Sequence, residues 1–265
     1  MGILPINNIE EILLKADVNN ATLIESLLDK HGAYLQFRGD LTSLDRIITR
    51  LPSSTINSSS KLKIWVQIVE VYRSNALHAC SVLKAVEEDL LQTGDLESLN
   101  WARLERAFAL YCIAKSKPAL DILRSISKND LSINNQLRFL TYKMLLENQA
   151  DYFDVGRLAG EEALDLAMNY GFYDAIPKLK RYLSLSYRGT GELREALRVL
   201  HEAYKEAAQL DYPNIAKAWI AHDIGWMSYY IGHFDACDEW TRLGLSMLEP
   251  NTLFKLKDYL TQHLA

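Results

Sequence analysis

The segment GTGELREAL at residues 189–197 decides the fold of this chain, because its turn followed by a small helical residue returns at a regular spacing. An alanine, or a cysteine in its place, occupies five such positions: Ala79, Ala119, Ala159, Ala196 and Cys237. Their steps are 40, 40, 37 and 41 residues. Four residues further on stand Leu83, Leu123, Ala163, Leu200 and Thr241. Small or apolar residues at these offsets let a second helix pack closely against the first.

A repeat of about 40 residues made of two helices is similar to a tetratricopeptide (TPR) unit, lengthened from its usual ~34 residues. Such units cannot bury their apolar faces alone, so they stack on one another. The chain has only 12 Gly and 6 Pro residues, and it lacks the strand patterns that would alternate with helices in a parallel-sheet enzyme. The sequence therefore predicts an all-α fold, a right-handed superhelix of TPR-like helical hairpins, also called an α-α solenoid.

The expected organisation is one continuous domain in four parts. Residues 1–52 form an N-terminal helical cap, in which one helical pattern ends at Gly39 and the next stops at Pro52. The Ser-rich segment 53–60 has no periodic apolar positions and is expected to be a loop. About five hairpins follow over residues 61–250, at approximately 61–94, 97–130, 132–171, 174–211 and 213–249. Residues 251–265 have the amphipathic pattern of a C-terminal capping helix.

Composition and charge exclude several partners and compartments. The 265 residues carry a net charge of −5, so the surface has no general attraction for phosphate backbones, and no direct nucleic-acid contact is expected. No stretch approaches the ~20 apolar residues that a membrane span needs. The three cysteines lie far apart without paired spacing, which fits reduced thiols in a cytoplasmic protein.

The motifs of common active sites are missing from the sequence. There is no G-x-x-x-x-G-K-[ST] phosphate loop, no H-E-x-x-H or CxxC metal-ligand spacing, and no G-x-S-x-G nucleophile elbow. Adjacent carboxylates such as Glu161 and Glu162 are common on solvated helix faces. We therefore expect no enzyme activity, no metal and no cofactor.

The repeat register predicts which side chains face the concave groove. In TPR units the first helix of each pair lines the groove, mainly through its positions 2, 5, 9 and 12 when the small residue of the second helix is position 20. Together with Leu104 and Leu185, this register selects an aromatic wall and a basic patch: Trp101, Phe108, Tyr111, Lys178, Arg181, Arg188, Trp219, His222, Trp226 and Tyr229.

Such a groove suits a small-molecule ligand or an acidic, partly apolar peptide, because aromatic faces stack on sugars and apolar groups and guanidinium groups bind carboxylates or phosphates. The alternative is that these aromatic residues pack between hairpins, since longer helices rotate the inward face.

The stretch TLIESLLDKHGAYLQFRGDLTSLDRIITRLPSS, residues 22–54, resembles the helical-repeat region of the large ATP-dependent transcription regulators of the MalT/LuxR type. Gly39, Leu44, Leu51 and Pro52 occupy places that match the family pattern, and the likeness runs from about Thr22 to about Leu248. Family members also carry an N-terminal ATPase and a C-terminal helix-turn-helix domain, neither of which is in this sequence. The chain is thus either an excised domain or a stand-alone protein of the same architecture.

The resemblance implies a non-catalytic sensor domain of a bacterial transcription regulator, which binds a small-molecule inducer or a regulatory protein in its concave groove. It supplies no residues for a particular inducer. The alternative is a stand-alone TPR scaffold that docks a partner peptide or helix and has no role in transcription. Self-association stays open, because solenoid edges associate when capping is incomplete.

Overall fold

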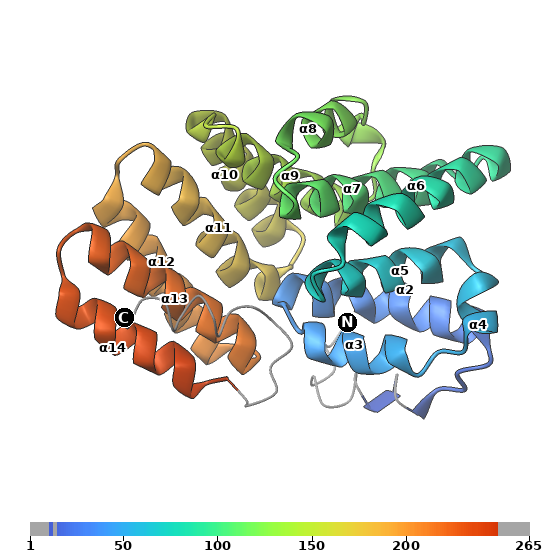
Figure 1. Ribbon diagram of the computed structural model, residues 1–265, viewed down its shortest axis with the longest axis horizontal. Coiled ribbons are helices and arrows are strands. Elements are labelled where there is room, and N and C mark those ends of the chain that lie inside the picture. The colour runs from blue at the N-terminus through green and yellow to red at the C-terminus, as the bar shows by residue number, and fades with distance from the viewer. Residues whose placement is uncertain (1–10, 13–14, 249–265) are drawn as a thin grey trace.

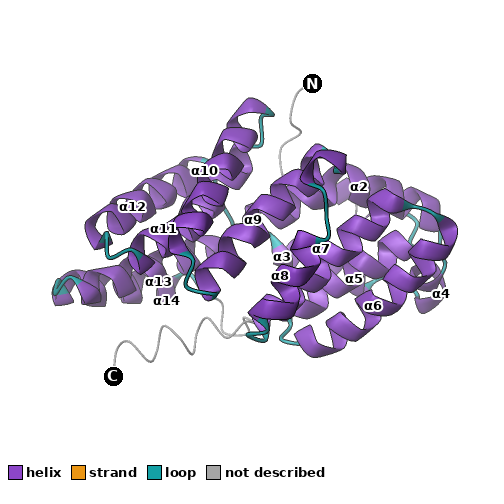
Figure 2. Ribbon diagram, turned by 90° about the horizontal axis from the view of Figure 1, so that it is seen from above, coloured by secondary structure: helices purple, strands orange, loops and turns teal. Residues whose placement is uncertain are grey.

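The computed structural model describes residues 11–12 and 15–248, and this part of the chain is helical without a strand (Figures 1 and 2). The prediction of an all-α fold is confirmed. The elements are α2 (Ala21–Arg38), α3 (Leu41–Thr49), α4 (Ser53–Asn57), α5 (Ser60–Tyr72), α6 (Ala76–Thr93), α7 (Leu96–Cys112), α8 (Ser116–Arg124), η1 (Lys128–Asp130), α9 (Ile133–Gln149), α10 (Phe153–Asn169), η2 (Tyr173–Ala175), α11 (Ile176–Gly189), α12 (Leu193–Gln209), α13 (Asn214–Tyr230) and α14 (Phe234–Ser246).

Five helical hairpins form the repeating part of the structure: α5 with α6, α7 with α8, α9 with α10, α11 with α12, and α13 with α14. The second helix of each of the first four hairpins also packs against the first helix of the next one. Figure 1 shows the resulting stack, which passes from the cyan α5 to the red α14. The helices are therefore arranged as an α-α solenoid.

The small residues of the 40-residue period lie where neighbouring helices touch. Ala119 and Ala196 are 0% exposed, and Cys237 is buried as well. Glycine serves the same purpose between α9, α10 and α11. A Cβ atom on Gly160 would lie 2.5 Å from the sulfur of Met144 in α9 and 2.9 Å from a methyl group of Leu183 in α11. The period seen in the sequence is thus the period of close helix contacts.

The segment 53–60 is not the expected loop, because its first five residues form the short helix α4. Pro52 has extended backbone angles, φ −61° and ψ 147°. Its carbonyl accepts a hydrogen bond from the amide of Ile56 at 3.1 Å, so Pro52 follows α3 and is also the N-cap of α4. Ser59 then caps α5, since its hydroxyl accepts a hydrogen bond from the amide of Leu62 at 3.2 Å. The serines that suggested a loop therefore serve as helix-terminal residues.

The turn between α2 and α3 follows the sequence signals closely. Gly39 adopts φ 77°, a left-handed conformation that glycine takes without strain, and it ends α2. Asp40 then caps α3, because its carboxylate accepts a hydrogen bond from the amide of Ser43 at 3.2 Å. The expected capping helix at 251–265 and the start of the N-terminal cap lie outside the described residues.

Within the described ranges 11–12 and 15–248, no helix has both the length and the apolar character needed to cross a membrane.

A leucine at a small-residue position should destabilise the stack. Ala196 is fully buried between α12 and its neighbours, so Ala196→Leu should lower the free energy of unfolding by about 1–3 kcal/mol through overpacking. Ala208 is exposed on the same helix, and Ala208→Leu is the control because alanine and leucine have similar helix propensities. Urea denaturation of both variants measures the effect. Equal stability of the two variants would contradict the proposed role of Ala196.

Candidate functional site

The C-terminal end of α2 reaches across the molecule to the fourth and fifth hairpins. A guanidinium nitrogen of Arg38 lies 2.8 Å from a carboxylate oxygen of Asp174, and the other donates a hydrogen bond to the carbonyl of Asp211. A Cβ atom on Gly39 would lie 3.4 Å from that of Ala216 in α13. We call this contact of residues 34–39 with residues 172–175 and 211–216 the clasp. Figure 1 shows the blue α2 and the golden α11 meeting at the centre of the molecule.

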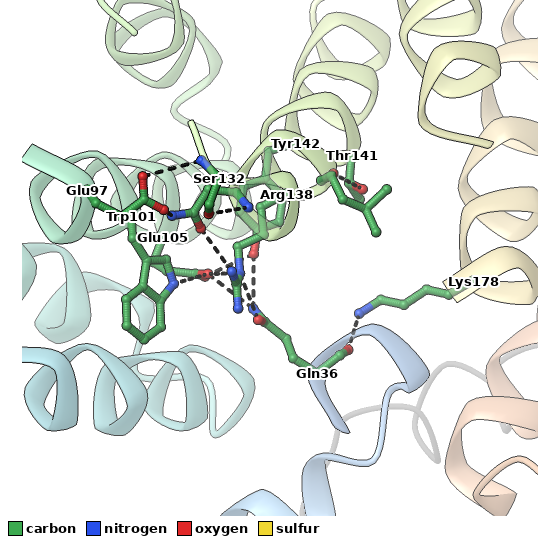
Figure 3. A network of polar contacts seen from close by, with 11 residues as sticks. Gln36, Glu97, Trp101, Glu105, Ser132, Arg138, Thr141, Tyr142 and Lys178 are labelled. Atoms are coloured by element: carbon green, nitrogen blue, oxygen red, sulfur yellow. Dashed lines mark hydrogen bonds and ion pairs between the residues drawn. The ribbon is translucent and has the colours of Figure 1, made fainter. Parts of the chain in front are cut away.

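A buried polar network connects the clasp to the first helices of the hairpins (Figure 3). Arg138 of α9 and Glu105 of α7 form an ion pair at 3.2 Å, and their side chains are only 5% and 2% exposed. Gln36 of α2 donates to Glu105 at 3.1 Å and accepts from Arg138 at 3.0 Å. Trp101 and Tyr142 also donate to the Glu105 carboxylate, at 3.1 and 2.9 Å. One carboxylate thus joins three helices.

Aromatic rings surround the cation of this pair. The guanidinium carbon of Arg138 lies 5.2 Å from the ring centre of Trp101, 5.3 Å from that of Phe37 and 5.9 Å from that of Trp65. These cation–π contacts are stronger when the cation is removed from water. The buried charges are therefore held by α2, α5, α7 and α9 together.

A small pocket lies beside this network, between the end of α2 and the concave face. Its volume of about 20 Å³ exceeds the roughly 10–15 Å³ that one water molecule needs. Its lining comes from α2, η2 and the first helices of four hairpins, and consists of Gln36, Phe37, Tyr72, Phe108, Arg138, Thr141, Tyr142, Ala175, Lys178, Leu179 and Tyr182.

Two basic residues line this pocket, Arg138 and Lys178. Arg138 pairs with Glu105, whereas Lys178 forms no ion pair with a carboxylate of the described residues. Its ammonium group donates a hydrogen bond to the carbonyl of Gln36 at 2.9 Å, near the C-terminal end of α2, where the helix dipole favours a cation. Burial, reinforced by the charge of Arg181, lowers the pKa of Lys178 to about 8. An anion bound in the pocket would oppose the effects of burial and of Arg181, and would raise the pKa of Lys178.

The basic patch and the aromatic wall of α11 and α13 are interleaved. The guanidinium carbon of Arg181 lies 4.9 Å from the ring centre of Trp219, and that of Arg188 lies 4.5 Å from that of Trp226. Arg181 also forms an ion pair with Asp223 at 2.6 Å. Burial opposes the ionisation of Asp223, but the neighbouring Arg181 lowers its pKa. The neighbouring His222 is buried, with Nδ1 2.8 Å from the same carboxylate.

The second hairpin differs most from the expected open groove. Trp101 and Phe108 are 6% and 5% exposed, and they pack against Trp65 and Tyr72 of α5, with ring centres 5.1 and 5.7 Å apart. Phe108 stacks on Tyr111 and Tyr142, with ring centres 5.9 and 4.8 Å apart, and also lines the pocket. In the fifth hairpin, Tyr229 is 54% exposed at the far end of α13. The selected residues are thus distributed between core, pocket and surface.

Sequence reasoning missed Gln36, Glu105, Arg138 and Tyr142. Gln36 belongs to the N-terminal cap, outside the repeat register. The signal that could have found Glu105 is its helical spacing, four residues after Trp101 and three before Phe108, which places a charged residue on the face of these aromatic residues. His, Cys, Asp and Glu side chains of the described residues form no group of three that could hold a metal ion.

No protein-family model and no curated protein matches this sequence. Among solved structures, the chain is similar to a Signal Transduction ATPase with Numerous Domains (STAND) protein with a tetratricopeptide repeat sensor from Pyrococcus horikoshii, with a TM-score of 0.70 and 14% identity. The match covers 99% of this chain and 40% of that protein, so this chain spans less than half of its length.

A second similar structure is a tetratricopeptide repeat protein from Parabacteroides merdae, with a TM-score of 0.58 and 11% identity. The match covers 98% of this chain and 91% of that one. At these identities the likeness concerns the fold alone. The chain has the fold of a TPR-like helical-repeat protein.

Proposed function

We propose that this chain is a non-catalytic TPR-like sensor domain of a bacterial transcription regulator, and that it recognises a small-molecule inducer in the pocket beneath the end of α2. The observation that carries the proposal is this pocket, which is lined by the first helices of four hairpins and contains a partly buried lysine and aromatic walls. The likeness of this fold to that of a STAND protein with a TPR sensor also supports the proposal of a sensor domain.

The clasp favours a small molecule over a peptide in this part of the groove. A bound peptide or helix would need the space in front of Trp101 and Phe108, where Gln36 and Phe37 of α2 already lie. The remaining space of about 20 Å³ admits a group of a few atoms. A larger inducer requires the end of α2 to shift.

That requirement couples ligand binding to the position of α2. Gln36 and Phe37 of α2 line the pocket together with Phe108, Arg138 and Lys178 of α7, α9 and α11. A ligand in the pocket therefore acts on the clasp and on the Glu105–Arg138 pair together. In a multidomain regulator, a shift of α2 would pass the signal to neighbouring domains.

A thermal-shift screen tests whether a small molecule binds this pocket. A ligand that binds only the native chain stabilises it by about 2.7 kcal/mol at 100 times its Kd, and the melting temperature rises accordingly. We expect hits among small metabolites such as sugars and carboxylic acids. Ala175→Val, which narrows the pocket, should weaken them, and Ala208→Val on the exposed face of α12 should not.

If the hits bind Ala175→Val with the same affinity as the native chain, the ligand binds outside this pocket. Stabilisation by peptides alone would support the scaffold alternative against the sensor proposal.

The buried ion pair should be intolerant of losing one partner. Arg138→Met leaves the Glu105 carboxylate buried without its cation and should lower the free energy of unfolding by about 3–5 kcal/mol. The double variant Glu105→Leu/Arg138→Met removes both charges and should recover most of that loss. Urea denaturation measures both, with Arg124→Met as the control because the Arg124 side chain is 64% exposed. A double variant as unstable as Arg138→Met would contradict this account.

A further inference from the structure

The ammonium group of Lys178 has unused hydrogen-bonding capacity at the pocket. A lysine has three N–H donors, and the described residues accept one hydrogen bond from Lys178, at the carbonyl of Gln36. The ring centre of Tyr182 lies 5.9 Å from its nitrogen. In the part of the chain that the structure describes, no carboxylate oxygen lies within 4.0 Å of this nitrogen.

The carboxylates that surround the pocket are each held by other cations or donors. Glu105 accepts hydrogen bonds from Gln36, Trp101 and Tyr142 and pairs with Arg138. Asp223 pairs with Arg181 and Asp174 with Arg38, at 2.6 and 2.8 Å. A charge that is partly removed from water and has no counterion is costly, so an anion from outside would be stabilised beside Lys178.

The other basic group of the lining is already engaged. Arg138 donates to Gln36 and Asn135 at 3.0 and 2.9 Å and pairs with Glu105. The pocket therefore offers a single positive charge to a ligand, which suits a monoanion better than a phosphate dianion. The ring faces of Phe37, Tyr72 and Phe108 line the same space and favour an apolar or planar body.

We propose that the ligand of this pocket is a small organic monocarboxylate. Its carboxylate group binds the ammonium group of Lys178, and its body lies against Phe37, Tyr72 and Phe108. This inference rests on the sensor function proposed above and names the chemical class of the ligand.

The proposal predicts a pH dependence in the neutral to alkaline range. The charged groups that act on Lys178 are Arg181 on its own helix, Arg138 on α9 and Glu105 on α7; the two arginines lower its pKa and Glu105 raises it. The tyrosines that face the pocket, Tyr72, Tyr142 and Tyr182, have pKa values raised above 10 by burial and stay neutral below pH 9.

With a pKa of about 8, the protonated fraction of Lys178 falls from about 0.9 at pH 7 to about 0.1 at pH 9. Because only the ammonium form attracts a carboxylate, the affinity should fall about tenfold between these pH values. Bound carboxylate should in turn raise the pKa of Lys178.

The experiment compares each carboxylate with its neutral amide: acetate with acetamide, and benzoate with benzamide. NMR titrations of the full chain at constant ionic strength, at pH 7 and pH 9, give the dissociation constants, and inorganic sulfate, which is doubly charged at both pH values, serves as the dianion. The variants are Lys178→Met and Lys180→Met. Lys180 lies on the same helix but faces Glu202 and Glu206 of α12, so it is the matched control.

At pH 7 we expect at least one carboxylate to bind at least tenfold more tightly than its amide and than sulfate. This preference should fall about tenfold at pH 9, disappear in Lys178→Met and persist in Lys180→Met. If Lys178→Met fails to fold, the pH dependence of the native chain and the comparison with the amides still test the carboxylate proposal.

Amides that bind as well as carboxylates would overturn the carboxylate inference and leave the sensor proposal standing. So would carboxylate binding that is insensitive to Lys178→Met and to pH. If neither carboxylates nor amides bind, the carboxylate inference is overturned, and the broader metabolite screen decides the sensor proposal separately.

Discussion

The buried charges of Glu105 and Arg138 constrain how the whole concave face is assembled. Removing two charges from water is expensive, and their attraction offsets this only when the remaining donors and acceptors are also satisfied. Gln36 of α2 supplies one of these partners, and Trp101 and Tyr142 supply others. Helix α2 therefore completes the network at the centre of the molecule, and the pocket with Lys178 lies beside it.

The hairpins could be read from the sequence because their signals are local. A small residue such as Ala119 or Ala196 is needed wherever two helices approach closely, and each one follows a turn within a few residues. The end of α2 is equally local, since Gly39 takes the left-handed conformation that the pattern indicated. Among the described residues, periodicity missed α4 at Ser53–Asn57, because a helix of five residues is too short to show it.

The site was less accessible to prediction, because the clasp depends on residues far apart in the chain. Gln36 meets Glu105 and Arg138 across 69 and 102 positions, and nothing in a 40-residue period specifies that contact. The repeat register selected Phe108 and Lys178 on the first helices α7 and α11, and both line the pocket. It could not show that Gln36 of α2 reaches Glu105 and Arg138.

The clasp also changes what kind of solenoid this is. In an ordinary helical-repeat protein each unit touches only its neighbours, so folding can begin anywhere and spread, and the end units fray independently. Here Arg38 contacts Asp211 across 173 positions, which joins α2 to the junction of the fourth and fifth hairpins. During synthesis from the N-terminus, α2 must wait for the fifth hairpin before its contacts are complete. Forming the clasp closes a loop between residues that are 173 positions apart, so its contacts must offset the entropy cost of that closure.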